Sequence, residues 1–172
     1  DSITTTATVT DLNEANPVFS AGANAAVNVA EGDTAVGTYT ATDADGTATQ
    51  TYSIVAVGDD ANSVDHDLFS INAGSGVLTF ASAPDFETPG CGAGNNGNTC
   101  VVVVQVTDGA RTDTITITAT VTDVEIAITD SQTGSVAEGT GTGSDIMTVA
   151  TTGDSMAGNS WAITAGNDDG EF

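Results

Sequence analysis

The chain has 172 residues, of which 39% are hydrophobic and only 5% aromatic, and it carries 24 acidic residues against one basic residue, Arg111. The resulting net charge of −23 excludes binding to nucleic acid or to an anionic membrane surface, because one arginine cannot neutralise a surface of phosphates. The hydrophobic content also excludes a disordered acidic chain, and no apolar run approaches the roughly 18 residues of a membrane helix.

Short strands separated by turn residues are predicted along the chain. Val, Ile and Thr alternate in several segments, which is the period-2 pattern of half-buried strands. Turn residues recur about every 8–12 positions, as in an all-β sandwich, and no segment sustains a helical period. The last but one strand is apolar on both faces, which is typical of a central strand. In chain order, strands are expected at residues 27–29, 37–42, 50–57, 68–71, 77–80, 101–106 and 114–121.

The sequence repeats itself at the spacing of one whole domain. Residues 1–11 return almost unchanged as residues 113–123, and Val-Ala-Glu-Gly at 29–32 returns at 136–139. This spacing matches a β-sandwich domain of about 100 residues. We therefore expect tandem repeats in three pieces. Residues 1–12 hold the last strand of a preceding repeat, residues 13–123 form a complete domain, and residues 124–172 form the first half of a following one.

The two incomplete pieces have two interpretations. If the chain is whole, its N-terminal strand would complete the half domain of the next copy, because an open half sandwich exposes a strand edge. Such head-to-tail strand addition gives an open filament. Alternatively, the chain is a piece of a longer array.

The excess of acidic residues also has two interpretations. It can serve solubility alone, especially at high salt, where self-repulsion is screened. Alternatively, the carboxylates hold metal cations, since the chain has almost no cations of its own. Their position decides in favour of the second, because the acidic motifs fall at strand ends, where they gather at the two poles of a sandwich.

These acidic motifs resemble those of the cadherin family, and the resemblance covers residues 11–123. Residues 11–19, Asp-Leu-Asn-Glu-Ala-Asn-Pro-Val-Phe, resemble the linker DxNDNxPxF between cadherin domains, with Glu14 in place of the usual Asp. Each motif alone is weak, but together they follow the family's order and spacing. The remaining motifs are Glu31 in Val-Ala-Glu-Gly, Asp43-Ala-Asp45, the segment 69–78, Asp85-Phe-Glu87 and Asp108 in Val-Thr-Asp-Gly. The resemblance implies a Greek-key β-sandwich of cadherin or immunoglobulin-like type.

The resemblance also implies Ca²⁺ as the cofactor, held at both poles. Calcium takes six to eight oxygen ligands from carboxylates, amides and backbone carbonyls, and crowded carboxylates without a cation would repel one another. The linker after residue 123 lacks the Asn and the Pro-x-Phe of the motif, so fewer ions are expected there. The N-terminal group would comprise Asp11, Asn13, Glu14, Asp43, Asp45 and Asp108, and the C-terminal group Glu31, Asp85, Glu87 and Asp123.

The two cysteines, Cys91 and Cys100, flank a loop rich in Gly and Asn. A disulfide that closes such a loop contributes about 2–3 kcal/mol in a chain-entropy account. Two cysteines with one distant histidine, His66, do not favour a zinc site. We predict the disulfide, and with it an oxidising extracellular compartment.

No enzyme is predicted from this sequence. Ser155 follows Gly-Asp as in some esterases, but His66 precedes it by a long way, and Asp85 with Glu87 lacks the aromatic platform of a sugar cleft. We expect a secreted or cell-surface adhesion or structural protein stiffened by calcium, as in a fibre or filament. Its partners would be like domains, copies of itself, or a glycan or cell-surface ligand. The alternative is a carbohydrate-binding or spacer module of a larger secreted enzyme or adhesin. The low Lys and Arg content favours a bacterial-type repeat protein.

Overall fold

The structure, a computed structural model, describes residues 1–9, 12–45, 49–125, 127–128 and 151–152. The chain divides into two compact units, Asp1–Asp123 and Val124–Phe172, and each is described by itself. Residues 1–9 form neither helix nor strand, and their side chains are exposed. That these residues end a preceding repeat stays a prediction.

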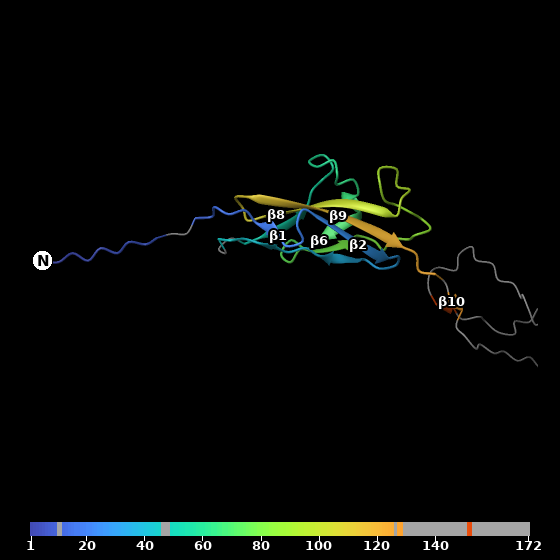
Figure 1. Ribbon diagram of the computed structural model, residues 1–172, viewed down its shortest axis with the longest axis horizontal. Coiled ribbons are helices and arrows are strands. Elements are labelled where there is room, and N and C mark those ends of the chain that lie inside the picture. Colours follow the sequence, from blue (N-terminus) through green and yellow to red (C-terminus); the bar gives the residue numbers. More distant parts are fainter. Residues whose placement is uncertain (10–11, 46–48, 126, 129–150, 153–172) are drawn as a thin grey trace, which may run out of the picture. The chain divides into compact units, whose positions relative to one another are not determined.

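The larger sheet of the first unit has the strand order β2-β9-β8-β5. Strands β8 (Thr99–Thr107) and β9 (Thr112–Thr122) form a long antiparallel hairpin at its centre, and β5 (Thr51–Ile54) extends it on the β8 side. Strand β2 (Asn24–Ala30) runs parallel to β9. Because parallel neighbours need a crossover connection, the chain between them builds the second layer of the domain (Figure 1).

That second layer is a sheet of order β3-β7-β6, formed by β3 (Ala35–Thr38), β7 (Val77–Phe80) and β6 (Phe69–Ile71). Strand β4 (Ala41–Thr42), which follows β3 in the chain, forms a short antiparallel pair with β1 (Val18–Phe19). The one helical element among the described residues is a 3-10 turn, η1 (His66–Leu68). The all-β class is confirmed.

The core follows the alternation of the long hairpin. In β9 the buried side chains are Ile115, Ile117, Ala119 and Val121, and the threonines between them stay partly exposed. Strand β8 differs, because Val103 is buried as well as Val102 and Val104. Residues 55–65 continue along the edge of β8 beyond β5, where Val103 N donates to Ser63 Oγ (3.0 Å) and Asp65 N donates to Val101 O (3.0 Å). The face of β8 that points away from the core is thus buried at Val103 and partly exposed at Val101 and Gln105.

All seven predicted strands have counterparts, with three differences. The segment 37–42 is divided into β3, which pairs with β7, and β4, which pairs with β1. The segment 50–57 ends at Ile54, after which the chain continues along the edge of β8. Strand β1 was not predicted, since two residues are too short to show a period.

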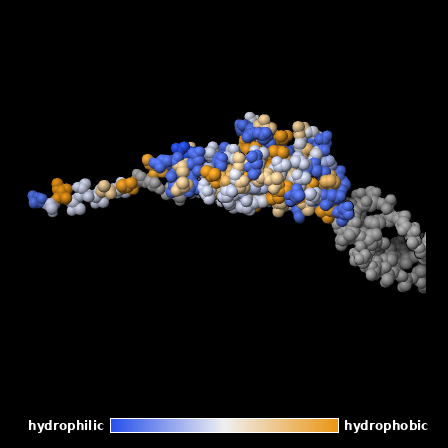
Figure 2. All heavy atoms as spheres, in the orientation of Figure 1, coloured by the Kyte–Doolittle hydropathy of each residue, from blue (hydrophilic) through white to orange (hydrophobic). Residues whose placement is uncertain are grey.

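In the second unit, β10 (Ala127–Ile128) pairs antiparallel with β11 (Thr151–Thr152). The predicted half domain 124–172 lies mostly outside the described residues, and it stays a prediction, as does strand exchange between copies. No helix within the described ranges has the length and apolarity to cross a membrane. Figure 2 shows hydrophilic residues spread over the visible face of the first unit, with hydrophobic ones between them. Large exposed hydrophobic side chains such as Leu12, Val57 and Val77 occur singly along the sequence.

Candidate metal centres

The N-terminal pole of the domain brings three separate segments together. Backbone N–H groups of Glu14 and Ala15 both donate to Asp45 Oδ2, at 2.7 and 2.6 Å. Asp45 N in turn donates to Asp43 Oδ1 at 2.9 Å. The third segment is the β8–β9 turn, where Asp108 accepts a hydrogen bond from the side chain of Asn13. The linker residues 12–16, the loop 43–45 and the turn after β8 therefore meet at one place.

Three oxygen atoms at this pole are buried and have no hydrogen-bond partner among the described residues: Asn13 Oδ1, Asp43 Oδ2 and Asp108 Oδ2. Buried oxygen atoms are normally satisfied, because an unpaired one costs about 1–3 kcal/mol. One amide carbonyl and two carboxylates form a hard oxygen donor set, which is what calcium prefers. All three residues belong to the predicted ligand group. This donor set fits a calcium ion.

Asp108 is held in its ionised form. Its Oδ1 accepts hydrogen bonds from Ala110 N and Arg111 N, both at 2.7 Å. These backbone bonds, and then the bond from Asn13, lower the pKa of Asp108 below its ordinary value. The turn therefore presents a charged carboxylate, with Oδ2 as the atom left for a cation.

The other predicted members of the N-terminal group are placed less completely. Asp11 lies outside the described residues. Glu14 has an exposed side chain, and its backbone joins the group through Asp45. Arg111, the single basic residue apart from histidine, donates to Asn16 Oδ1 at 3.2 Å and so braces the linker. Ala15 contributes its backbone N–H, which donates to Asp45 Oδ2 at 2.6 Å.

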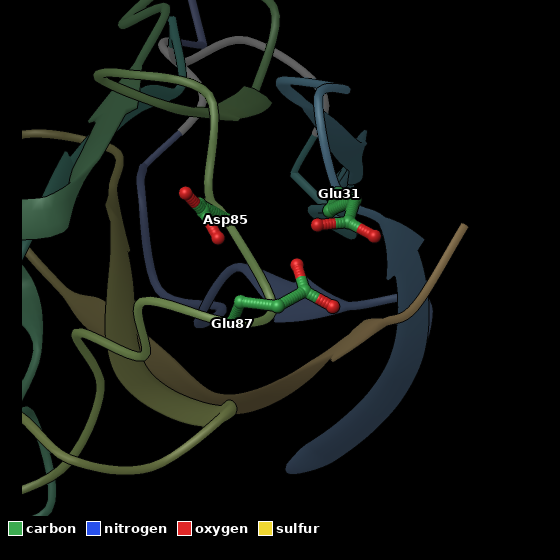
Figure 3. A group of neighbouring side chains, drawn as sticks. All are labelled: Glu31, Asp85 and Glu87. Carbon is green, nitrogen blue, oxygen red and sulfur yellow. The ribbon is translucent and has the colours of Figure 1, made fainter. Parts of the chain in front are cut away.

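The C-terminal pole has a second group, in which carboxylate oxygens of Glu31, Asp85 and Glu87 all lie within 4.8 Å of one another. Figure 3 shows the Glu31 and Glu87 carboxylates facing each other, with Asp85 beside them. Glu31 follows β2 directly and is buried, whereas Asp85 and Glu87 are exposed on the loop after β7. Three like charges this close repel one another unless a cation compensates them.

Backbone contacts hold the C-terminal group in place. Glu31 Oε2 accepts from Phe86 N at 2.9 Å, between the two loop acids, and Gly32 N donates to Pro84 O at 2.9 Å. Glu31 N donates to Thr122 O at 3.0 Å at the end of β9. Asp123 comes next in the chain and is exposed. The converging group contains three of the four predicted residues, and Asp123 adjoins it through the chain.

The disulfide between Cys91 and Cys100 is present, with Cα atoms 4.7 Å apart, which confirms the prediction. Sequence reasoning did not single out the neighbouring residue Asp65. Asp65 is buried, and its carboxylate accepts from Gly92 N at 2.6 Å and Val101 N at 2.7 Å. Asp65 lies in an acidic stretch with Asp59, Asp60 and Asp67, so no sequence signal separates it from exposed acids.

Comparison with solved structures identifies the fold. Mouse clustered PcdhgC3 EC1-3 is 25% identical with a TM-score of 0.52, covering 67% of this chain and 36% of that chain. Protocadherin Gamma B2 extracellular cadherin domains 3-6 are 21% identical with a TM-score of 0.52, covering 72% and 30%. Human Protocadherin-24 EC1-2 is 19% identical with a TM-score of 0.50, covering 81% and 60%. The chain thus spans less than two thirds of each. No protein-family model and no curated protein matches the sequence.

Proposed function

We propose that this chain, whose first unit is a cadherin-like β-sandwich, is an extracellular adhesion-type module that binds calcium at both poles. The similarity to structures described as extracellular cadherin domains supports the adhesion class and a role without catalysis. The observation that carries the calcium proposal is the set of three buried oxygens at the N-terminal pole that have no hydrogen-bond partner in the part of the chain that the structure describes. The disulfide supports an oxidising compartment outside the cell.

At the N-terminal pole, the ion would be held by the group predicted from the sequence: Asp11, Asn13, Glu14, Asp43, Asp45 and Asp108. A bound calcium ion there supplies positive charge that compensates carboxylates from three segments at once. Asp45 already fixes the linker, because its Oδ2 accepts the N–H groups of residues 14 and 15. Asn13 and Asp108 face each other across the linker and the turn. Since the ligands come from both the linker and the domain, binding would stiffen the connection to an adjoining repeat.

At the C-terminal pole, Glu31, Asp85, Glu87 and Asp123 would form the second site. The convergence of three carboxylates within 4.8 Å supports it, together with the position of Asp123 at the exit of the domain. Fewer ions are expected here than at the first pole, because the following linker lacks the Asn and Pro-x-Phe of the motif. The proposed partners are like domains or copies of this chain. The alternative of a glycan-binding module gains no support, since the loop 89–99 contains no aromatic residue.

Isothermal titration calorimetry of the 172-residue chain with calcium, after removal of divalent ions, tests the proposal. We expect saturable binding that is lost in part when Asp43→Asn removes a charged donor at the first pole. Magnesium should compete poorly, because it demands a stricter octahedral geometry. Asp59→Asn is the matched control, since it removes the same charge from an exposed residue outside both groups. Absence of calcium binding to the unmodified chain would refute the proposal.

A further inference from the structure

The acidic loop after β7 contacts the core through Phe86, which packs against it between the two loop acids. A pocket of about 310 Å³ lies under the loop, and its lining includes Phe80, Pro84, Asp85, Thr88 and both cysteines. Interiors are normally packed without such space. Beside this packing of Phe86, the loop that carries Asp85 and Glu87 depends on specific attachments at its base.

Those attachments converge on the base of the loop. The disulfide joins Cys91 to Cys100, at the start of β8, and both cysteines are buried. Asp65 reaches across from the segment before η1 and accepts from Gly92 N and Val101 N, one residue beyond each cysteine. Asn98 Nδ2 donates to Phe86 O at 3.0 Å, within the acidic motif itself. The disulfide and the buried Asp65 carboxylate thus hold the chain at residues 91–92 close to the chain at residues 100–101.

We propose that the Cys91–Cys100 disulfide, supported by Asp65, positions the acidic loop so that Asp85 and Glu87 meet Glu31 as one cation-binding group. The Phe86 N–H that donates to Glu31 Oε2 lies between the two loop acids, so a displaced loop would move both carboxylates away from Glu31. The inference rests on the proposed function in that this group binds calcium.

The expected effect follows from loop lengths. Eighteen residues, 81–98, separate β7 from β8, whereas ten residues, 81–90, separate β7 from the anchored Cys91. Loop closure becomes less favourable with roughly the 3/2 power of loop length, so release of Cys91 should weaken calcium affinity at this pole by about two- to threefold. Loss of Asp65 should add to the effect.

The test measures calcium affinity in the full chain with the first pole weakened by Asp43→Asn, and the part of the remaining binding that depends on Glu87 is assigned to the C-terminal group. Glu87→Gln in this background should remove that binding. The cysteine pair is then changed to serine. Ser63→Ala is the control, because it removes a bond from the same segment to β8, at Val103 N, without touching the acidic loop. Hydrogen exchange of the loop amides in chelator provides a second measurement, independent of calcium.

We expect the cysteine change to weaken the Glu87-dependent binding two- to threefold and to speed exchange at the amides of Phe86 and Thr88, whereas Ser63→Ala changes neither. Unchanged affinity and exchange would overturn the inference and leave the calcium proposal standing. No Glu87-dependent binding in the oxidised chain would refute the C-terminal site, and the inference with it. If the serine variant does not fold, Asp65→Asn is measured in the chain with the disulfide intact. Weaker binding and faster loop exchange would then support the inference, and no change in either would overturn it.

Discussion

Replacing Asp43 with asparagine should change the stability of the domain in opposite directions with and without calcium. In chelator, Asp43 Oδ2 is buried and has no hydrogen-bond partner among the described residues, and the same holds for Asn13 Oδ1 and Asp108 Oδ2. An amide at this position keeps an oxygen to accept the bond from Asp45 N and adds an N–H₂ donor for a neighbouring oxygen. Since each unsatisfied buried oxygen costs about 1–3 kcal/mol, the variant should be more stable than the unmodified chain by an amount in that range.

In calcium, the Asp43→Asn variant should instead be less stable than the unmodified chain. Binding to the folded state alone adds about 2.7 kcal/mol at a free calcium concentration of a hundred times Kd. The variant loses one charged ligand and hence much of this term. For a domain of this size, 1 kcal/mol corresponds to about 4 °C in Tm, so both shifts are measurable by thermal melting.

Urea denaturation followed by circular dichroism gives the two free energies of unfolding. Urea is preferable to guanidinium because it is uncharged and does not screen the carboxylates. The exposed control Asp59→Asn should shift stability equally in both conditions. Equal destabilisation by Asp43→Asn in chelator and in calcium would show that the buried oxygens do not form a cation site, and would refute the reasoning.

Three further predictions concern the scaffold. Asp65→Ala leaves two backbone N–H groups buried without an acceptor and should lower the free energy of unfolding by about 3 kcal/mol or more, as urea denaturation would show; a loss under about 1 kcal/mol would contradict its role. Gly76→Ala should cost at least about 2 kcal/mol, because a Cβ there would lie 2.2 Å from Tyr39 O at a φ of +68°; Gly90→Ala, which meets open space, is the control. Because hydrogen bonds lower the pKa of Asp108, its contribution is present above the unfolded pKa and is lost as pH falls through the folded one. In chelator, Asp108→Asn should therefore flatten the acid limb of a melting profile against pH, and an unchanged limb would contradict this.

Much of the architecture was accessible from local chemistry. The alternation of Ile and Val with Thr in β9 specifies which side chains enter the core, because successive residues of a strand point to opposite faces. The apolar run of β8 indicated burial on both faces, which holds at Val103 on the face away from the core. The disulfide was predictable because the chain has only two cysteines and they flank one loop. The acidic motifs could be assigned to strand ends because turn residues follow them.

Contacts between distant segments were beyond such reasoning. The residues of β2 do not indicate that this strand pairs in parallel with β9, because the pairing partner depends on how the two sheets pack. Asp65 looks like its acidic neighbours in the chain, yet tertiary packing buries it against the base of the disulfide loop. The resemblance assigned Asp123 to the second pole, and three-dimensional geometry shows that the oxygens which converge are those of Glu31, Asp85 and Glu87. Side-chain type and spacing are local properties, whereas burial and convergence arise only when segments far apart in the chain are brought together.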